Sequence, residues 1–150
     1  MFNDKIYATQ NNNTSNAILM FESFICSKYA EILDKENEKE RLFNLGIAAG
    51  RDFVVKARSG KIEDEEAEKI YFSILFRLSG PTVDFVIGRI YESASEIAKY
   101  RINSCGSKIN IDLFKRENKC TEENILLDSQ ELKKVWAERL YNDSNCSLLK

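Results

Sequence analysis

Apolar residues recur at spacings of three and four along most of this chain, and that spacing places them on one face of an α-helix. The first such segment runs from Asn16 to Asp34. Its apolar residues are Ile18, Leu19, Phe21, Phe24, Ile25, Tyr29, Ile32 and Leu33. Because this apolar face is wide, we expect the first helix to be central or to pack on two sides.

Four further segments repeat the helical spacing. They are Lys39–Arg58, Ile62–Ser79, Pro81–Ile102 and Ser129–Asn142. Gly60 is placed to end the second helix, since glycine is favoured just after a helix. Pro81 is placed to begin the fourth helix, because the missing N–H of proline costs nothing at the first helical position.

The stretch Asn103–Cys120 is less regular. Ile109, Ile111 and Leu113 alternate with polar residues as in a short strand, but a single strand would lack a partner, so we expect an ordered loop. Thr121–Leu127 is expected to form a short helical turn. The sequence therefore predicts an all-α fold, a single compact bundle of about five helices. That domain covers residues 15–142, between a flexible leader (1–14) and a C-terminal tail (143–150).

Glycine also stands inside two of the predicted helices. Gly46 and Gly50 lie four residues apart on one face of the second helix, and Gly88 lies in the fourth. A glycine in a helix interior costs up to about 1 kcal/mol relative to alanine. We therefore expect these three glycines to mark places where another helix approaches closely.

The composition limits the chemistry. The chain has no histidine, which excludes His-based acid–base catalysis, Ser-His and Cys-His nucleophile pairs and His-ligated metal sites. The net charge of −2 argues against a nucleic-acid partner, because binding phosphates needs a basic surplus or stripe. No phosphate-binding glycine loop is present. We expect no cofactor, no metal and no nucleic-acid partner.

The four cysteines, Cys26, Cys105, Cys120 and Cys146, allow two interpretations. No pair has the C-x-x-C spacing of a redox motif or a zinc knuckle. In the first interpretation all four are free thiols, and Cys26 is a small core residue. In the second, one or two disulfides form in an exported protein. Cys105 and Cys120 would then close a short loop, and Cys146 would hold the C-terminal tail.

Whether the cysteines are free or paired also bears on the cellular compartment of the protein. No apolar run approaches the roughly 18 residues of a membrane span. Residues 1–13 lack the charged and then apolar pattern of a signal peptide. If Met1 stands in place of a removed signal peptide, we expect a periplasmic protein, and otherwise a cytoplasmic one.

Carboxylates gather at the start of the third predicted helix, as Glu63, Asp64, Glu65 and Glu66. Negative charge in a first turn favours the positive end of the helix dipole. The same four residues are also candidates for contact with a basic partner.

A second group of candidates lies on the fourth predicted helix. Asp84, Gly88 and Glu92 are four residues apart and so share one side of that helix. Gly88 would let another group approach the backbone between the two carboxylates. Arg89 and Tyr91 stand beside them and are further candidates for binding a partner, since exposed aromatic and arginine side chains often dominate protein interfaces.

We expect a non-enzymatic protein-binding domain, because the usual catalytic groups are missing. The chain resembles the small all-helical immunity proteins of bacterial contact-dependent and type VI secretion systems. The resemblance rests on a compact helical domain with Cys26 in its first helix and glycines in its central helices. It implies an inhibitor that neutralises a toxin or effector, with exposed acidic residues covering a basic active site.

Two other functions are alternatives. One is a carboxylate-dependent enzyme with Asp84 and Glu92 on the 81–102 helix as the acid–base pair, which predicts a cleft there and shifted carboxylate pKa values. The other is a structural or adaptor subunit of an exported assembly. That subunit would form an oligomer through an apolar face left over on the fourth or last helix.

Overall fold

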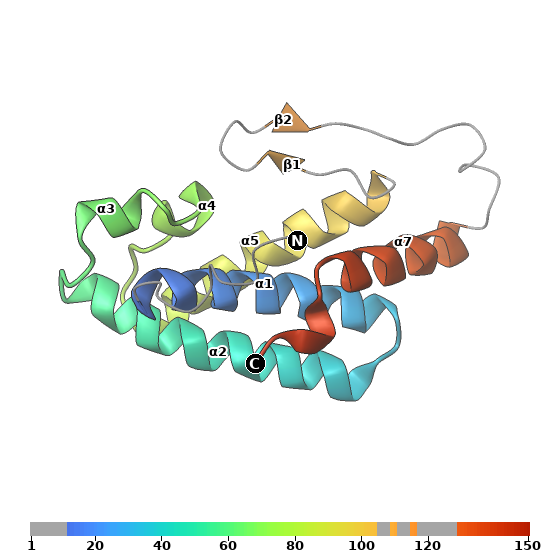
Figure 1. Ribbon diagram of the computed structural model, residues 1–150, viewed down its shortest axis with the longest axis horizontal. Coiled ribbons are helices and arrows are strands. Elements are labelled where there is room, and N and C mark those ends of the chain that lie inside the picture. Colours follow the sequence, from blue (N-terminus) through green and yellow to red (C-terminus); the bar gives the residue numbers. More distant parts are fainter. Residues whose placement is uncertain (1–11, 105–108, 111–114, 117–128) are drawn as a thin grey trace, which may run out of the picture.

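The computed structural model describes residues 12–104, 109–110, 115–116 and 129–150. Its long helices are α1 (Asn12–Ile32), α2 (Glu36–Arg58), α5 (Val83–Asn103) and α7 (Ser129–Asp143). The shorter ones are α3 (Asp64–Ala67), α4 (Phe72–Leu75) and the 3-10 helix η1 (Cys146–Leu148). The predicted all-α fold and single compact bundle are confirmed (Figure 1).

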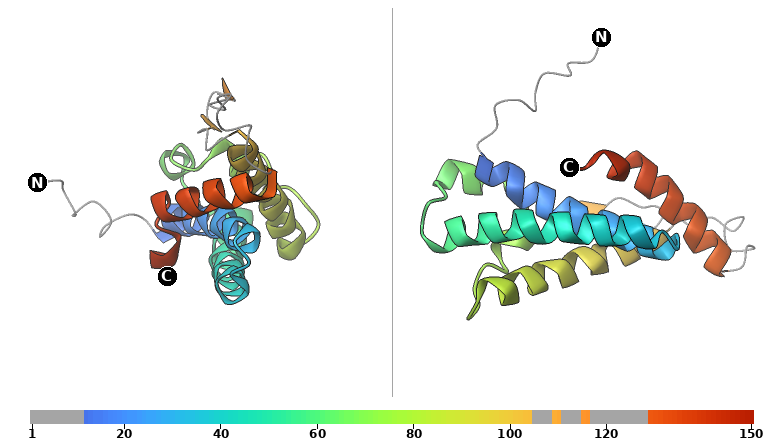
Figure 2. Two further views of the ribbon diagram at one scale, coloured as in Figure 1. Left: turned by 90° about the vertical axis from the view of Figure 1, so that its right-hand side faces the viewer. Right: turned by 90° about the horizontal axis from the view of Figure 1, so that it is seen from below.

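Helix α1 lies at the centre of the bundle. The helices α2, α5 and α7 all pack against it, as the end-on view in Figure 2 shows. Phe21, Phe24 and Tyr29 of α1 are fully buried, together with Phe53 of α2 and Ile90 of α5. The wide apolar face of the first predicted helix therefore packs against several neighbouring helices.

Two glycines of α2 bring that helix close to α1. A Cβ on Gly46 would lie 2.5 Å from Cε1 of Phe24, and a Cβ on Gly50 would lie 2.8 Å from Sδ of Met20. Neither separation leaves room for a methyl group, so the prediction of a close helix approach is confirmed at both positions. Their cost in helix propensity is offset by the tight packing of two large side chains.

The single helix predicted over Ile62–Ser79 is wrong, because this stretch forms the two short helices α3 and α4. Helices α2 and α5 meet this connection at the same end of the bundle (Figure 2). One continuous 18-residue helix would be about 27 Å long and would carry the chain away from that end. The break at Tyr71, which has an extended ψ of 131°, folds the segment back while Ile70 and Ile74 remain buried.

Helix α5 begins two residues after the position that the proline suggested. Thr82 is the N-cap, and its side-chain oxygen accepts a hydrogen bond from the backbone N–H of Phe85 at 3.1 Å. Pro81 therefore precedes the cap instead of opening the helix. A threonine hydroxyl can satisfy one of the free N–H groups of the first turn, which proline cannot do, and this explains the later start.

The irregular stretch contains two residue pairs in strand conformation. β1 (Ile109–Asn110) and β2 (Lys115–Arg116) pair antiparallel, with Ile109 opposite Arg116. The expectation of a loop without a strand is therefore wrong at Ile109, because β2 supplies the partner that the sequence pattern did not reveal. Ile111, Leu113 and the helical turn expected over Thr121–Leu127 lie outside the described residues.

The C-terminal end is fastened to the first helix. Cys26 of α1 and Cys146 of η1 form a disulfide, with 5.5 Å between their Cα atoms, and both side chains are fully buried. The interpretation with four free thiols is therefore wrong, and the predicted disulfide tether of the C-terminal part is confirmed. Cys105 and Cys120, the other candidate pair, lie outside the described residues.

Candidate functional site

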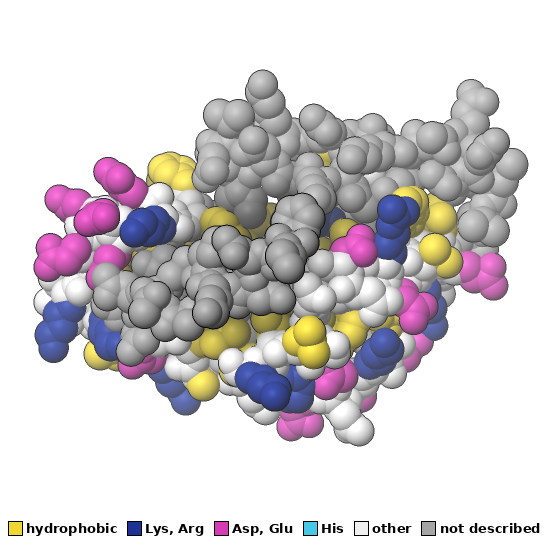
Figure 3. All heavy atoms as spheres, viewed as in Figure 1, with side chains coloured by type: hydrophobic (Ala, Val, Ile, Leu, Met, Phe, Trp, Pro, Cys, Tyr) yellow, Lys and Arg dark blue, Asp and Glu magenta, His cyan; other side chains and the backbone are white. Residues whose placement is uncertain are grey.

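The acidic residues of the third predicted helix lie at the start of α3. Glu63 is the N-cap of α3, and Glu63, Asp64 and Glu65 are exposed, whereas Glu66 is buried. Acidic side chains gather over this end of the molecule in Figure 3. Three of the four candidate carboxylates are thus available to a partner, and Glu66 is held within the fold.

Beside these carboxylates, α4 presents two phenylalanines to solvent. The rings of Phe72 and Phe76 stack on each other with 5.9 Å between their centroids, and 49 % and 67 % of the two residues remain exposed. An apolar patch is visible next to the acidic side chains in Figure 3. We call Glu63, Asp64, Glu65, Phe72 and Phe76 the α3–α4 surface.

Sequence reasoning missed the two phenylalanines. It placed them in one long helix over Ile62–Ser79 and did not include them among the candidate binding residues. The available signal was their spacing, because Phe72 and Phe76 are four residues apart and so lie on the same side of any helix. The break before α4 then turns that side outward.

The second group of candidates lies on the outer side of α5, at one edge of the bundle. Asp84 is exposed and its Oδ1 lies 3.3 Å from Nε of Arg51 on α2. Glu92 is exposed, and none of the described residues forms an ion pair with it. Arg89 donates a hydrogen bond to the backbone oxygen of Ser79 at 2.7 Å, so it helps to fix the segment before α5.

The spacing of Asp84 and Glu92 limits what the pair can do as an acid and a base. Eight residues along a helix separate two positions by about 12 Å. In glycoside hydrolases the two catalytic carboxyl groups lie roughly 5 to 9.5 Å apart. The rise along the helix between Asp84 and Glu92 is thus larger than the separation of the two carboxyl groups in those enzymes.

Tyr91 belongs to an aromatic cluster between α1, α2 and α5. Its ring packs edge-to-face on Phe24, with 5.2 Å between centroids, and on Phe43, with 5.4 Å. Phe24 is fully buried, whereas Tyr91 is partly exposed and Phe43 is exposed. The cluster closes the edge of the core and leaves part of the Tyr91 and Phe43 rings at the surface.

Gly88 does not mark a helix crossing, so that prediction is wrong. A Cβ built on Gly88 would meet no atom within 4 Å, and the residue is exposed. The sequence could not distinguish it from Gly46 and Gly50, because all three stand inside helical patterns and only the position of neighbouring helices separates them.

A polar cluster that sequence reasoning missed holds the C-terminal tail on α2. Arg41 donates to both carboxylate oxygens of Glu38, at 2.7 and 3.0 Å, and to the backbone oxygens of Leu149 and Cys146, at 2.7 and 3.2 Å. The hydroxyl of Tyr141 donates to Glu38 at 2.5 Å. Together with the disulfide, these bonds fasten α7 and η1 to the first two helices.

The electrostatics of this cluster follow from its contacts. The hydrogen bond from Arg41 and the one from Tyr141 stabilise the charged form of Glu38 and lower its pKa. Burial and the bond to Glu38 raise the pKa of Tyr141 to about 12. At neutral pH the cluster therefore contains a carboxylate, a guanidinium and a neutral phenol in their bonding forms.

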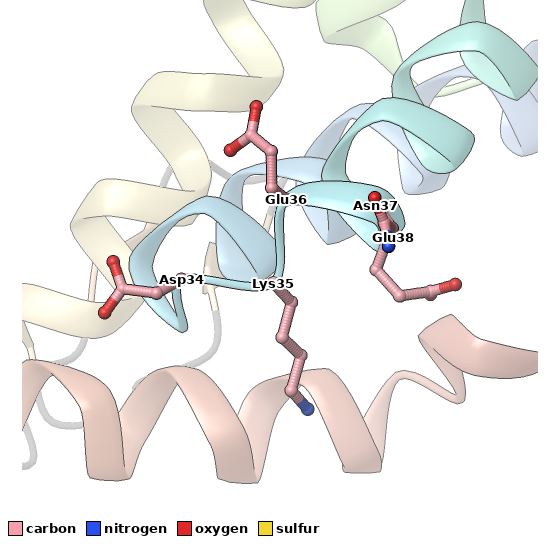
Figure 4. Close-up of a pocket in the computed structure, with 5 residues that line it drawn as sticks. All are labelled: Asp34, Lys35, Glu36, Asn37 and Glu38. Carbon is pink, nitrogen blue, oxygen red and sulfur yellow. The ribbon is translucent and has the colours of Figure 1, made fainter.

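An open hollow of about 410 Å³ lies beside the cluster at the turn between α1 and α2. Figure 4 shows Lys35 extending from this turn towards α7, where its Nζ lies 4.7 Å from the centre of the Tyr141 ring. The carboxylates that line the hollow are already paired: Asp34 with Lys134, Glu36 with Lys39 and Glu38 with Arg41. We therefore assign no ligand to this hollow.

Comparisons with known proteins give no relative for this chain: no family model, no curated protein and no solved structure matches it. Within the described ranges, no group of three or more Cys, Asp or Glu side chains is placed to hold a metal ion, and no helix is long and apolar enough to cross a membrane.

Proposed function

We propose that this protein is a non-catalytic protein-binding domain, and that it acts as an immunity-type inhibitor that neutralises a bacterial toxin or effector. The observation that carries the proposal is the exposed stack of Phe72 and Phe76 on α4. Burying the exposed parts of both side chains would contribute about 3 kcal/mol, or more than a hundredfold in the dissociation constant. Large exposed aromatic side chains are typical centres of protein interfaces.

The chemistry around the stack favours a basic partner. Glu63, Asp64 and Glu65 are exposed beside the two rings. Lys69 lies 3.9 Å from Glu65, whereas none of the described residues forms an ion pair with Glu63 or Asp64. Carboxylates at the rim of an apolar contact attract a positively charged surface and raise the rate of association. A toxin with a basic active site, such as one that acts on a phosphate-containing substrate, has the complementary charge.

The Cys26–Cys146 disulfide supports action in an oxidising compartment. Stable disulfides form in the periplasm and outside the cell, whereas the reducing systems of the cytoplasm keep most thiols free. We accordingly place the inhibitor among exported proteins, so its partner is to be sought in the cell envelope.

A photo-crosslinking amino acid at position 76 of the full chain tests the proposal in the cell that makes the protein. We expect a crosslink to one protein species, and none from position 55, because Val55 is 54 % exposed on α2 and lies outside the α3–α4 surface. The crosslinked protein is then purified, and its affinity for the wild-type chain is compared with that for Phe72→Ala/Phe76→Ala.

The expected loss of affinity in that double variant is about a hundredfold. Val55→Ala is the matched control and should bind like the wild type. Equal crosslinking from positions 55 and 76, or unchanged affinity of the double variant, would show that the α3–α4 surface is not the recognition surface. If the crosslinked partner is not toxic to cells that lack this protein, the immunity role is refuted and the binding role stands.

A further inference from the structure

The residues between α2 and α5, 59–82, are fastened to the bundle by little buried apolar surface, and we call them the connecting segment. Ile70 and Ile74 are the two buried apolar residues of this stretch. Ser73 is also buried, and its Oγ has no hydrogen-bond partner among the described residues. An unpartnered buried hydroxyl lowers the stability of the form that buries it. The connecting segment is therefore the weakly held part of the bundle.

The two helices of the connecting segment cannot be stable by themselves. α3 and α4 have four residues each, and neither N-cap side chain forms a capping hydrogen bond. Isolated helices shorter than about 12 residues are marginal in water. Their hydrogen bonds also stay within the segment, as between the N–H of Ile74 and the oxygen of Tyr71 at 2.8 Å. The helical form of the segment consequently depends on its contacts with the bundle.

Tyr71 makes two of these contacts, and both reach the central helix α1. Its ring packs edge-to-face on the fully buried Phe21, with 5.5 Å between centroids, and its hydroxyl donates a hydrogen bond to Glu22 at 3.3 Å. Tyr71 is the N-cap of α4, so Phe72 follows it directly. The position of Tyr71 on α1 therefore sets the direction in which α4 presents its phenylalanines.

We propose that the connecting segment opens and closes as one unit on a bundle that stays folded, and that Tyr71 is the positioning residue that holds it closed. The inference rests on the proposed function only in that the closed form presents the α3–α4 surface. Opening unwinds α4 and so separates the stacked rings of Phe72 and Phe76. A partner that recognises this stack binds the closed form alone and shifts the segment towards it.

Hydrogen exchange of the full oxidised chain, followed by mass spectrometry, tests the proposal. We expect the hydrogen-bonded amides of the connecting segment to exchange at least about tenfold faster than those of α1 and α2, because local opening costs less free energy than global unfolding. Tyr71→Leu should accelerate exchange in this segment alone by a further factor of about five or more. Tyr71→Phe keeps the ring on Phe21 and should restore most of the protection.

Phe43→Leu is the matched control. Phe43 lies on α2 and its ring packs on Phe24 of α1, with 6.0 Å between centroids, so this change removes an aromatic contact with α1 at another place. It should leave exchange of the connecting segment unchanged.

Three results would overturn the proposal. They are exchange of the connecting segment no faster than that of α1, no effect of Tyr71→Leu, and an equal acceleration of all helices by Tyr71→Leu. None of these measurements needs the partner. The absence of a crosslink from position 76 would therefore count against the proposed function and leave the opening of the segment standing.

Discussion

Reduction of the Cys26–Cys146 disulfide should remove a large part of the stability of this protein. The bond joins residues separated by 120 positions in the sequence. Closing a loop of that length lowers the entropy of the unfolded chain, and by the chain-entropy argument this stabilises the folded state by about 4.9 kcal/mol at 25 °C. Residual structure in the unfolded state lowers such values, so we expect the free energy of unfolding to fall by about 3 to 5 kcal/mol.

The assay compares oxidised and reduced forms of one chain. In the variant Cys105→Ser/Cys120→Ser, Cys26 and Cys146 are the only remaining cysteines. Urea unfolding followed by far-UV circular dichroism, with and without a dithiol reductant, gives the two free energies. The hydrogen bonds from Arg41 to the backbone oxygens of Cys146 and Leu149 do not involve the cysteine sulfurs, so we expect the reduced form to keep its helix content.

Two results would refute this reasoning. One is alkylation of Cys26 and Cys146 in the unreduced, denatured chain, since a disulfide leaves no thiol to react. The other is a loss of less than about 1 kcal/mol on reduction, which would mean that the unfolded chain gains little freedom. A variant in which all four cysteines are replaced serves as the control, because the reductant should leave its stability unchanged.

The remaining predictions concern packing and pH. Gly46→Ala should destabilise the fold by about 1 to 2 kcal/mol in urea unfolding, because its Cβ would lie 2.5 Å from a ring of the fully buried Phe24. Gly88→Ala meets no neighbour and should instead stabilise by up to about 1 kcal/mol; the same sign in both variants would contradict the packing argument. The lowered pKa of Glu38 adds stability above its unfolded pKa of about 4.3, and this stability is lost as pH falls through the folded pKa. The free energy of unfolding of Glu38→Gln should therefore fall less than that of the wild type between about pH 6 and pH 3. An equal fall in both proteins would show that the Arg41–Glu38–Tyr141 cluster does not hold the tail.

The long helices could be predicted because each carries its own apolar face. The stripe around Phe21, Phe24 and Tyr29 is wide enough to indicate a central helix, and α1 is central. The stretch between α2 and α5 could not be predicted in the same way. The spacing of its apolar residues is helical throughout. The helix is nevertheless interrupted at Tyr71, because the segment has to join the end of α2 to the nearby start of α5. No local pattern contains the distance between those two helix ends.

The candidate site was predicted in part. The sequence identified the carboxylates at Glu63–Glu65 and on α5, because charge and spacing can be read directly from the chain. It did not identify Phe72 and Phe76, since an apolar residue in a helical segment is normally buried. Nor did it identify the bonds from Arg41 to the tail, which join residues more than 100 positions apart.

The sequence by itself determined the helical class, the central role of the first helix and the limits on chemistry set by the absence of histidine. These properties depend on residue types and on spacings within a few turns. Only the tertiary structure decided that Cys26 pairs with Cys146, that Gly46 and Gly50 face α1 while Gly88 faces solvent, and that two phenylalanines of α4 remain exposed. The physical reason is that burial and pairing belong to surfaces brought together from distant parts of the chain, and a glycine or a cysteine carries no local sign of what it will meet.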